Sequence, residues 1–335
     1  MKNKKKILII GGLGFIGHNL AIFLKKFGYK LKIIDSLLIN NILALKKNPL
    51  EYPNPKIAKK FLIDRLKLIK KNNIIFDKLD ARNYKKLTRS INKFSPDVVI
   101  HLAAVSHANK SNKNPYTTFD HSLRTLENAI DAVRNKKVHF IYFSSSMVYG
   151  DFKKNIVSET DQLKPKGIYG SLKLAGELLV KAYKQVFNLN YTIIRPSALY
   201  GERCISRRVG QVFIENLIQK KKLVVNGSSK QRLDFTYIDD LMMGVKKVIE
   251  NKKSLNETFN LTYGHSESLG TMMKILKRNF KNFEVTYEKK DKLMPKRGTL
   301  SVNKAKKLIK YKPNFNLEKG YQRYINWYKI QKFKN

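Results

Sequence analysis

The sequence is poor in cysteine and in acidic residues. Its 335 residues include one cysteine, Cys204, which excludes an internal disulfide framework and any zinc site built from several cysteines. We therefore expect a reducing, cytoplasmic compartment. Only 25 Asp and Glu stand against 68 Lys and Arg, a formal net charge of +43. No uninterrupted apolar stretch reaches the roughly 18 residues of a membrane-spanning helix, so we expect no membrane partner.

The remaining composition fits a folded chain. Hydrophobic residues make up 42% and aromatic residues 11%, enough for a large core, which argues against disorder. The length suits two modest domains, or one domain with an elaborated cap. We interpret the positive charge first as lysine filling a solvated surface. The same charge would attract anionic ligands, either small phosphorylated molecules or nucleic acid. No metal is expected, since His101 and His107 lack further ligands at a metal-binding spacing.

Short apolar runs alternate with helical patterns along the first half of the chain. Continuous apolar strands separated by helices predict an α/β fold with a parallel sheet covered on both faces. The expected strands are Ile7–Ile10, Leu31–Ile34, Val98–Leu102, Phe140–Phe143 and Tyr191–Ile194, and the clearest helices are Phe15–Phe27 and Ser171–Phe187.

A basic insertion, residues 40–73, follows the second expected strand. Pro49, Pro53 and Pro55 stiffen its first half, and apolar residues at helical spacing predict an amphipathic helix over Ile57–Lys71. We expect this insertion to be a surface excursion without a catalytic role.

A glycine-rich turn joins the first strand to the first helix. Gly11, Gly14 and Gly17 stand at the spacing G-x-x-G-x-x-G, which permits a tight turn and lets a pyrophosphate approach the helix N-terminus. Asp35 ends the next strand, where a carboxylate accepts hydrogen bonds from ribose hydroxyls and repels a 2′-phosphate. Because no arginine follows Asp35 closely, the sequence favours NAD over NADP as cofactor.

A second motif carries acid–base chemistry. Tyr169 and Lys173 stand four residues apart at the start of a helix, on one face. A phenol is a poor base at neutral pH, but a nearby ammonium favours its phenolate. The strand that ends at Phe143 runs into the serines 144–146, and a hydroxyl at the carboxyl end of a parallel strand points into the ligand crevice.

Taken together, these motifs resemble the NAD-dependent epimerase/dehydratase family, the extended short-chain dehydrogenases/reductases that modify nucleotide sugars. The resemblance covers nearly the whole chain. Further segments that carry it are Asp80 with Arg82, His101–Ala104, Ser144–Gly150, Arg195-Pro196, Arg232–Asp240, Arg297-Gly298 and Lys304–Pro313.

The resemblance implies roles for individual residues. Tyr169 would be the base and acid, Lys173 would hold the nicotinamide ribose and favour the phenolate, and Ser145 would be the catalytic hydroxyl. Cofactor contacts are implied at Gly11, Gly14, Phe15, Ile16, Gly17, Asp35, Asp80, Ala81, Leu102, Ala103, Ala104, Tyr169 and Lys173. Substrate contacts are expected at Ser146, Arg207, Arg208, Arg232 and Arg297. Arg232 matches an arginine that binds the substrate diphosphate in the family, and Arg297 matches a second arginine that binds phosphate or sugar.

The resemblance also implies a domain plan. An NAD-binding domain with a doubly wound parallel sheet of the Rossmann type would span residues 1–195, with 234–262 returning to it. A smaller C-terminal α/β substrate-binding cap would comprise 196–233 and 263–335. A homodimer would form through the helices after Pro115 and Tyr169.

Three departures from the family pattern bear on the reaction. Ser146 and Met147 stand where 4,6-dehydratases often carry acidic residues, which disfavours elimination of water. Ser197-Ala198 and Ser122 replace asparagines that are usual in the family. We therefore expect an NAD-dependent nucleotide-sugar epimerase acting at carbon 4 through a transient 4-keto sugar. The alternatives are a dehydrogenase, reductase or decarboxylase of the same family, and a non-catalytic nucleic-acid-binding protein on a dehydrogenase scaffold, which the intact Tyr169, Lys173 and Ser145 disfavour.

Overall fold

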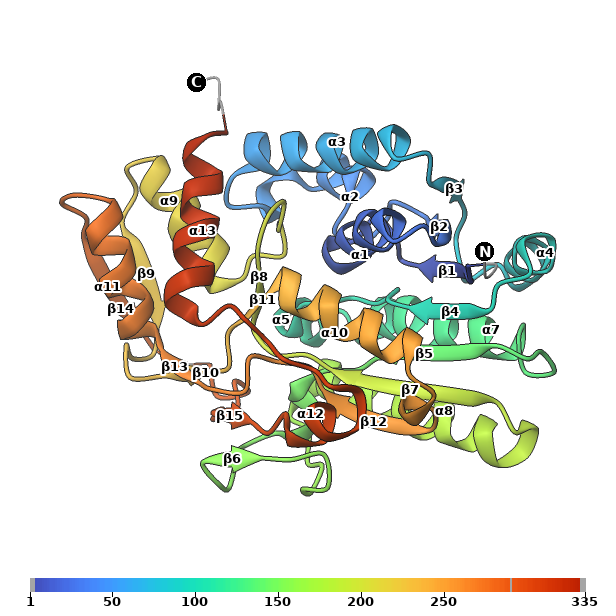
Figure 1. Cartoon of the computed structure of the whole chain (residues 1–335). Coiled ribbons are helices and arrows are strands. Elements are labelled where there is room, and N and C mark those ends of the chain that lie inside the picture. The colour runs from blue at the N-terminus through green and yellow to red at the C-terminus, as the bar shows by residue number, and fades with distance from the viewer. Residues whose placement is uncertain (1–3, 290, 332–335) are drawn as a thin grey trace.

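The computed structural model describes residues 4–289 and 291–331 (Figure 1). Residues 290 and 332–335 of the expected cap lie outside the described residues. The central sheet has seven parallel strands in the spatial order β12-β7-β5-β4-β1-β2-β3. Its strands are β1 (Lys6–Ile10), β2 (Lys30–Asp35), β3 (Ile75–Lys78), β4 (Val98–His101), β5 (His139–Phe143), β7 (Asn190–Arg195) and β12 (Glu257–Asn260). The expected α/β class and doubly wound parallel sheet are thereby confirmed.

Helices cover both faces of the sheet, because alternate residues of each strand point to opposite sides. Ile7 and Ile9 of β1 belong to the core on the side of three helices, α1 (Phe15–Lys26), α3 (Pro55–Lys71) and α10 (Ile238–Glu250). Leu8 and Ile10 belong to the core on the opposite side, formed with α4 (Tyr84–Phe94), α7 (Thr125–Asp131) and α8 (Gly167–Phe187).

The chain order reverses at the middle of the sheet. Strand β1 lies between β2 and β4, so the chain winds outward to β3 on one side and to β12 on the other. A doubly wound sheet binds its ligand at the carboxyl ends of the strands at such a switch point. The topology therefore predicts a ligand site at the loops that follow β1 and β4.

A second group of elements lies beside the carboxyl ends of the strands, at the left of Figure 1. It contains α9 (Val209–Ile218), α11 (Leu269–Asn279) and α13 (Leu317–Lys329), together with the parallel pair β9 (Leu223–Asn226) and β14 (Val285–Glu288). Three further strand pairs are β8 (Leu199–Tyr200) with β11 (Thr236–Tyr237), β10 (Arg232–Leu233) with β13 (Glu267–Ser268), and β6 (Ile156–Val157) with β15 (Thr299–Leu300).

Short helices complete the chain. They are α2 (Ile42–Lys47), η1 (Pro49–Glu51), α5 (Ala108–Lys113), α6 (Pro115–Phe119), η2 (Asp120–Arg124), η3 (Ser146–Tyr149), η4 (Lys252–Ser254) and α12 (Asn303–Ile309).

The basic insertion forms the expected amphipathic helix, α3, but the expectation of a surface excursion is wrong. Helix α3 packs against α1, and its Phe61 ring lies 4.9 Å from the Trp327 ring of α13. Arg65 in the same helix is 1% exposed. The insertion therefore connects the N-terminal sheet with the C-terminal helices.

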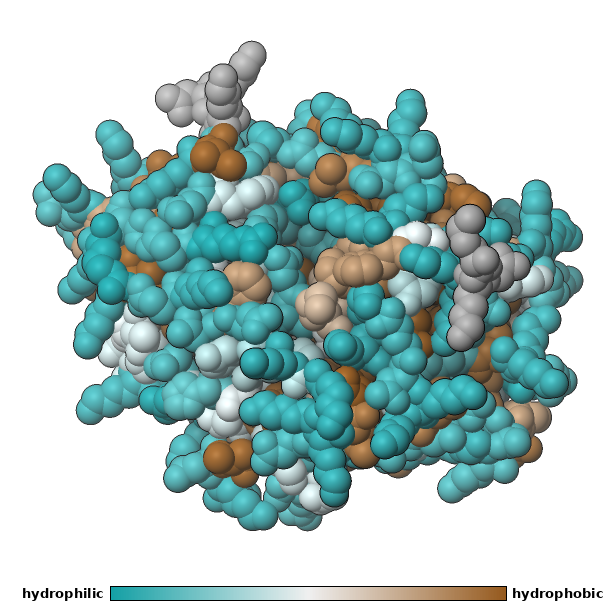
Figure 2. Space-filling view, viewed as in Figure 1, coloured by the Kyte–Doolittle hydropathy of each residue, from teal (hydrophilic) through white to brown (hydrophobic). Residues whose placement is uncertain are grey.

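The molecular surface is largely hydrophilic on the face shown in Figure 2, where apolar patches are small and scattered. This pattern agrees with lysine as a solvated surface residue. Within the described residues, none of the helices is both long enough and apolar enough to cross a membrane.

Candidate active site

The glycine-rich turn after β1 lies against the end of β4. Gly11 has φ +82°, and a Cβ built on it would lie 2.7 Å from the backbone nitrogen of Ala103. Only glycine accommodates both this conformation and this contact. Gly14 precedes the first turn of α1 without a side-chain cap, so the amide groups of that turn remain available to an anion.

Asp35 ends β2 beside this turn. Its carboxylate accepts hydrogen bonds from the backbone amides of Leu13, at 2.9 Å, and Leu37, at 2.8 Å. Burial raises the pKa of Asp35, and the two amides and the charge of Arg65 oppose that rise. A carboxylate has about four acceptor positions, so Asp35 retains capacity for ribose hydroxyls.

One cavity gathers the residues expected to contact the cofactor, apart from Tyr169 and Lys173. It is lined by Gly11, Gly14, Phe15, Ile16, Gly17, Asp35, Asp80, Ala81, Leu102, Ala103 and Ala104. Arg65, Ser36, Asn40 and His121 also line it. Sequence reasoning missed these four. Arg65 and His121 are far from the glycine motif in the chain, and no local pattern marks them.

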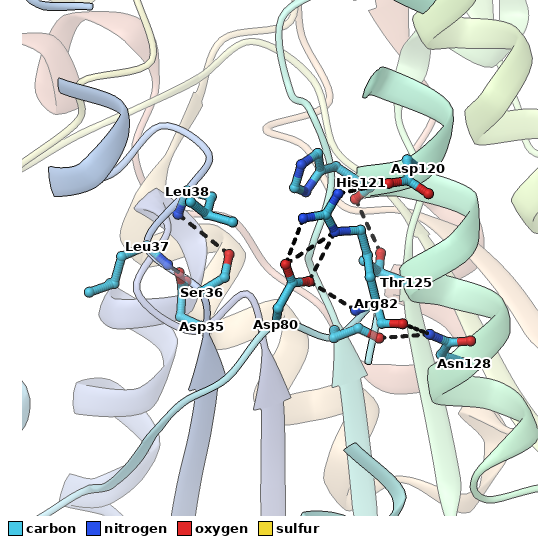
Figure 3. A network of polar contacts seen from close by, with 11 residues as sticks. Asp35, Ser36, Leu37, Leu38, Asp80, Arg82, Asp120, His121, Thr125 and Asn128 are labelled. Atoms are coloured by element: carbon cyan, nitrogen blue, oxygen red, sulfur yellow. Dashed lines mark hydrogen bonds and ion pairs between the residues drawn. The ribbon is translucent and has the colours of Figure 1, made fainter. Parts of the chain in front are cut away.

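Asp80 takes part in an ion-pair network at the edge of this cavity (Figure 3). Arg82 Nη2 donates to the Asp80 carboxylate at 2.7 Å, and Arg82 Nη1 donates to Asp120 at 2.7 Å. Burial tends to raise the pKa of Asp80, but hydrogen bonds from Arg82 hold it below its ordinary value. Asn128 donates to the carbonyl groups of Ala81 and Arg82, at 2.9 Å each, and fixes this turn.

The Tyr-x-x-x-Lys pair lines a second cavity, a cleft that also includes Ser145 and Ser146. Lys173 is buried, and its Nζ donates to the Phe143 carbonyl at 2.7 Å. Burial lowers the pKa of Lys173 to about 8, against a smaller opposing effect of the Glu177 charge. The Tyr142 ring centroid lies 5.1 Å from the same nitrogen, which favours its charged form.

The serines after β5 have different partners. Ser145 Oγ accepts the backbone amide of Met147 at 3.2 Å, so this hydroxyl caps η3 and also faces the cleft. Ser146 is buried and lines the same cleft. Ser144 donates its hydroxyl to Glu177.

A buried ion pair supports this region, and sequence reasoning missed its acidic member. Glu177 accepts hydrogen bonds from Arg195 Nε at 2.9 Å and Nη2 at 2.6 Å, and both side chains are at most 1% exposed. Arg195 Nη1 also donates to Tyr149 Oη at 2.8 Å. Glu177 continues the i, i+4 spacing of Tyr169 and Lys173, a pattern that could have identified it.

The cleft is cationic. Arg207, Arg208 and Arg297 line it, and none of the described lining residues is Asp or Glu. Burial, followed by the charge of Arg208, lowers the pKa of Arg297 to about 10. Arg297 Nε is buried without a hydrogen-bond partner. This arrangement favours an anionic ligand with several acceptor oxygens.

The structure does not bring Arg232 into the cleft. Successive residues of a strand face opposite sides, and in β10 Leu233 lines the cleft while Arg232 does not. Arg232 Nε instead donates to Ser266 Oγ at 3.1 Å.

Tyr169, Lys173 and Ser145 together can move a proton. In its phenolate form the half-buried Tyr169 side chain can accept a proton from a substrate alcohol, and the Ser145 hydroxyl in the same cleft can orient that oxygen. Oxidation of that alcohol to a carbonyl group also needs a hydride acceptor next to the reacting carbon. The neighbouring cavity has the residues to hold one.

The sequence is similar to those of known NAD-dependent enzymes. A model of the NAD dependent epimerase/dehydratase family matches residues 7–262. The uncharacterized UDP-glucose epimerase YtcB of Bacillus subtilis is 30% identical over 322 residues, covering 94% of this chain and 95% of that protein. The UDP-glucuronate 4-epimerase of Thermodesulfobacterium geofontis is 27% identical over 326 residues, covering 96% and 95%.

A solved structure extends the likeness to three dimensions. The UDP-glucuronic acid 4-epimerase from Bacillus cereus, in complex with UDP-glucuronic acid and NAD, aligns with a TM-score of 0.85 and 27% identity. The alignment covers 97% of this chain and 99% of that one.

Proposed function

The chain belongs to the NAD-dependent epimerase/dehydratase family, and from this premise we propose that it is an NAD-dependent epimerase that inverts carbon 4 of a UDP-sugar. The observation that carries the proposal is that the two cavities meet. Ile16, Leu102, Ala104, Ser106, Leu199, Ser206 and Arg208 line both the cofactor cavity and the cleft that holds Tyr169.

The first cavity fits NAD. The bare backbone of the glycine turn and the uncapped start of α1 suit a pyrophosphate, and Asp35 suits an adenosine ribose without a 2′-phosphate. Asp80 and Ala81 would face the adenine, and Leu102, Ala103 and Ala104 the diphosphate and ribose. Bound NAD supplies the hydride acceptor and, in the return step, the hydride donor.

The residues of the cleft supply the proton transfers. Tyr169 takes the proton of the 4-hydroxyl as the 4-keto sugar forms and returns it when the alcohol is restored. Ser145 orients the same oxygen through its hydroxyl. Lys173 places a positive charge behind the phenol and is positioned by the Phe143 carbonyl. The keto sugar must turn over within the cleft between the two steps.

The arginines of the cleft anchor the nucleotide during this rotation. Arg208 and Arg297 hold the diphosphate, because Arg297 is buried with an unpartnered Nε and Arg208 is its charged neighbour. Arg207 contributes charge, and Ser146 lies beside the sugar. Arg232 has no part in this assignment, since Leu233 stands in the cleft in its place.

Elimination of water is disfavoured. A dTDP-D-glucose 4,6-dehydratase of Dictyostelium discoideum is 30% identical over 275 residues, so dehydratases are also among the relatives. Ser146 and Met147, which follow Ser145 in the cleft, supply no carboxyl group for that chemistry. The cleft therefore supports epimerisation over dehydration.

Two assembly features belong to the proposal. The cofactor-binding part comprises residues 1–195 and 234–262, and the substrate-binding cap comprises 196–233 and 263–335, with the cleft between them. The chain forms a homodimer through α6 and α8. These helices contact each other and expose apolar side chains, namely Tyr116, Phe119, Leu178 and Val186.

An NMR assay tests the function. The purified protein is loaded with NAD and incubated with UDP-glucose, UDP-glucuronate, UDP-N-acetylglucosamine, dTDP-glucose, GDP-mannose and CDP-glucose in separate tubes. We expect inversion at carbon 4 in a UDP-sugar and no net absorbance at 340 nm. Net NADH formation with an unchanged configuration would show a dehydrogenase or an oxidative decarboxylase instead.

A further inference from the structure

The segment of residues 203–208, here called the arginine segment, carries Arg207 and Arg208 into the cleft. It follows β8 and leads into α9. Arg203 and Arg207 have φ values of +60° and +55°, in the left-handed region that side chains other than glycine rarely adopt. Such a backbone persists only where surrounding contacts hold it.

Arg65 of the insertion supplies one of these contacts. Its side chain is 1% exposed, its Nη1 donates to the Leu13 carbonyl at 3.1 Å, and its Nη2 donates to the Arg203 carbonyl. Leu13 lies in the glycine-rich turn. The guanidinium of Arg65 thus joins the glycine-rich turn to the arginine segment.

A second part of the insertion holds the side chain of Arg207. Arg207 Nη1 donates to the Glu51 carbonyl at 2.8 Å, and its guanidinium carbon lies 5.7 Å from the Tyr52 ring centroid. The Glu51 carboxylate in turn pairs with Lys110 of α5 at 2.9 Å. Glu51 of η1 therefore holds the Arg207 side chain near α5, whose Ala108 and Asn109 line the cleft.

The first helix of the sheet domain holds the other end of the segment. Arg203 Nε donates to His18 Nε2 at 3.2 Å, and Arg203 Nη2 donates to Asn19 Oδ1 at 3.2 Å. Burial, together with the charges of Arg65 and Arg203, keeps the pKa of His18 well below its ordinary value. A neutral imidazole can accept this hydrogen bond.

We propose that the insertion is a brace for the substrate site and that Arg65 is its positioning residue. Arg65 holds the arginine segment against the glycine-rich turn, so that Arg208 faces the nucleotide diphosphate. The role of Arg208 rests on the proposed function. The bridge between Leu13 and Arg203 does not.

Binding and kinetics of four variants test the brace in NAD-loaded protein. R65M removes the bridge, and R65K restores one donor. K67M removes a charge from the exposed face of the same helix, and I69A removes a buried apolar side chain from the last turn of that helix. We expect R65M to weaken UDP binding by about tenfold or more in calorimetry, since it removes two hydrogen bonds from a charged donor.

The pattern across variants separates positioning from stability. R65K should recover part of the UDP affinity, K67M should match the wild type, and I69A should lower Tm while keeping UDP affinity. In turnover, R65M should raise KM far more than it lowers kcat, because the brace touches neither the reacting carbon nor Tyr169. Equal UDP affinity in R65M and wild type would overturn the proposal.

Hydrogen exchange gives a readout that needs no substrate. Amides of residues 203–212 should exchange faster in R65M than in the wild type, while K67M should leave them unchanged. If the wild type binds no UDP, the nucleotide assignment fails but this comparison still decides the brace. Unchanged exchange in R65M would reject it.

Discussion

At the scale of single residues, the site depends on a buried ammonium. Lys173 lies among Phe143, Tyr142 and Glu177, and burial makes its charged form costly. Its Nζ donates to the Phe143 carbonyl at 2.7 Å, in the cleft that Tyr169 also lines. Stability is given up at this position where the chemistry needs a cation.

Y169F tests the acid–base role of the phenol. The variant keeps the ring but loses the group that accepts and returns the proton. We expect kcat to fall by about 10²- to 10⁴-fold, with NAD still bound. Turnover by NMR and NAD content after denaturation measure both effects. Wild-type turnover in Y169F would remove Tyr169 from the mechanism.

The pKa of Lys173 predicts how stability depends on pH. The folded value is about 8 and the reference value is 10.5, so between them the unfolded chain binds more protons. The free energy of unfolding should therefore gain about 3 kcal/mol from this group as pH rises from 8 to 10.5. K173M lacks this gain. Denaturant unfolding of both NAD-free proteins across pH 7–10.5 should show their stability difference changing by that amount, and parallel curves would contradict it.

At the scale of elements, α8 carries Tyr169 and Lys173, two of the proposed catalytic residues, and its Gly176 makes room for the Tyr142 side chain. A Cβ on Gly176 would lie 2.2 Å from Tyr142 Oη. The helix can thus approach β5 closely, and the Tyr142 ring lies beside Lys173. In β10, successive side chains point to opposite sides of the strand. Leu233 therefore faces the cleft, while Arg232 points away from it and donates to Ser266.

G176A should disturb both stability and catalysis. The new methyl group must push Tyr142 aside, at a cost of about 1–3 kcal/mol for overpacking. G270A in α11 is the matched control, because the nearest atom to the added Cβ is the side-chain hydroxyl of Ser268, at 3.3 Å. We expect a lower Tm and kcat only in G176A. A fully active, stable G176A would show that this contact has no role.

The arginine assignment makes a contrasting prediction for two variants. R297M should raise KM for the UDP-sugar by about tenfold or more, because it removes a charged donor from the diphosphate. R232M should leave KM within about twofold, since its guanidinium binds Ser266. Steady-state kinetics decides between them, and a reversed order would place Arg232 in the cleft.

Local patterns were enough for part of this fold. Apolar runs identified the central strands, and the helix of the insertion began within two residues of its expected start. Strands β3 and β12, with the sequences IFDK and ETFN, were missed because they carry few apolar residues. For Arg232, a motif match did not reveal which of two adjacent residues faces the cleft.

The remaining site residues depend on contacts between distant parts of the chain. Arg65 reaches Leu13 and Arg203 only once α3 has docked, and local spacing contains no sign of that docking. Glu177 was accessible in principle from its spacing to Lys173, but its partner Arg195 lies on another element. Periodicity predicts which face is buried, and not what it meets.

At the scale of the whole molecule, net charge bears on ligand entry and exposed apolar side chains bear on assembly. The net charge of +43 surrounds a cleft whose described lining has no Asp or Glu, which favours the entry of anionic nucleotides. Apolar side chains are exposed on α6 and α8, where Tyr116 is 85% and Leu178 59% exposed. A second copy of the chain would cover them.

L178E tests the proposed dimer. A carboxylate that the dimer would bury among apolar side chains is costly, so L178E should shift the protein to a monomer. L50E is the control, because Leu50 is 96% exposed on η1. Analytical ultracentrifugation should show a dimer for the wild type and L50E, and a monomer for L178E. A wild-type monomer would dismiss the interface.

The fate of the hydrogen on carbon 4 tests the central claim most directly. A UDP-sugar deuterated at carbon 4 is turned over in ordinary water by the NAD-loaded protein, and the product is analysed by NMR and mass spectrometry. Transient oxidation with return of the same hydride predicts an inverted carbon 4 that keeps its deuterium. Loss of the deuterium to solvent, or release of deuterated NADH without an epimer, would contradict it.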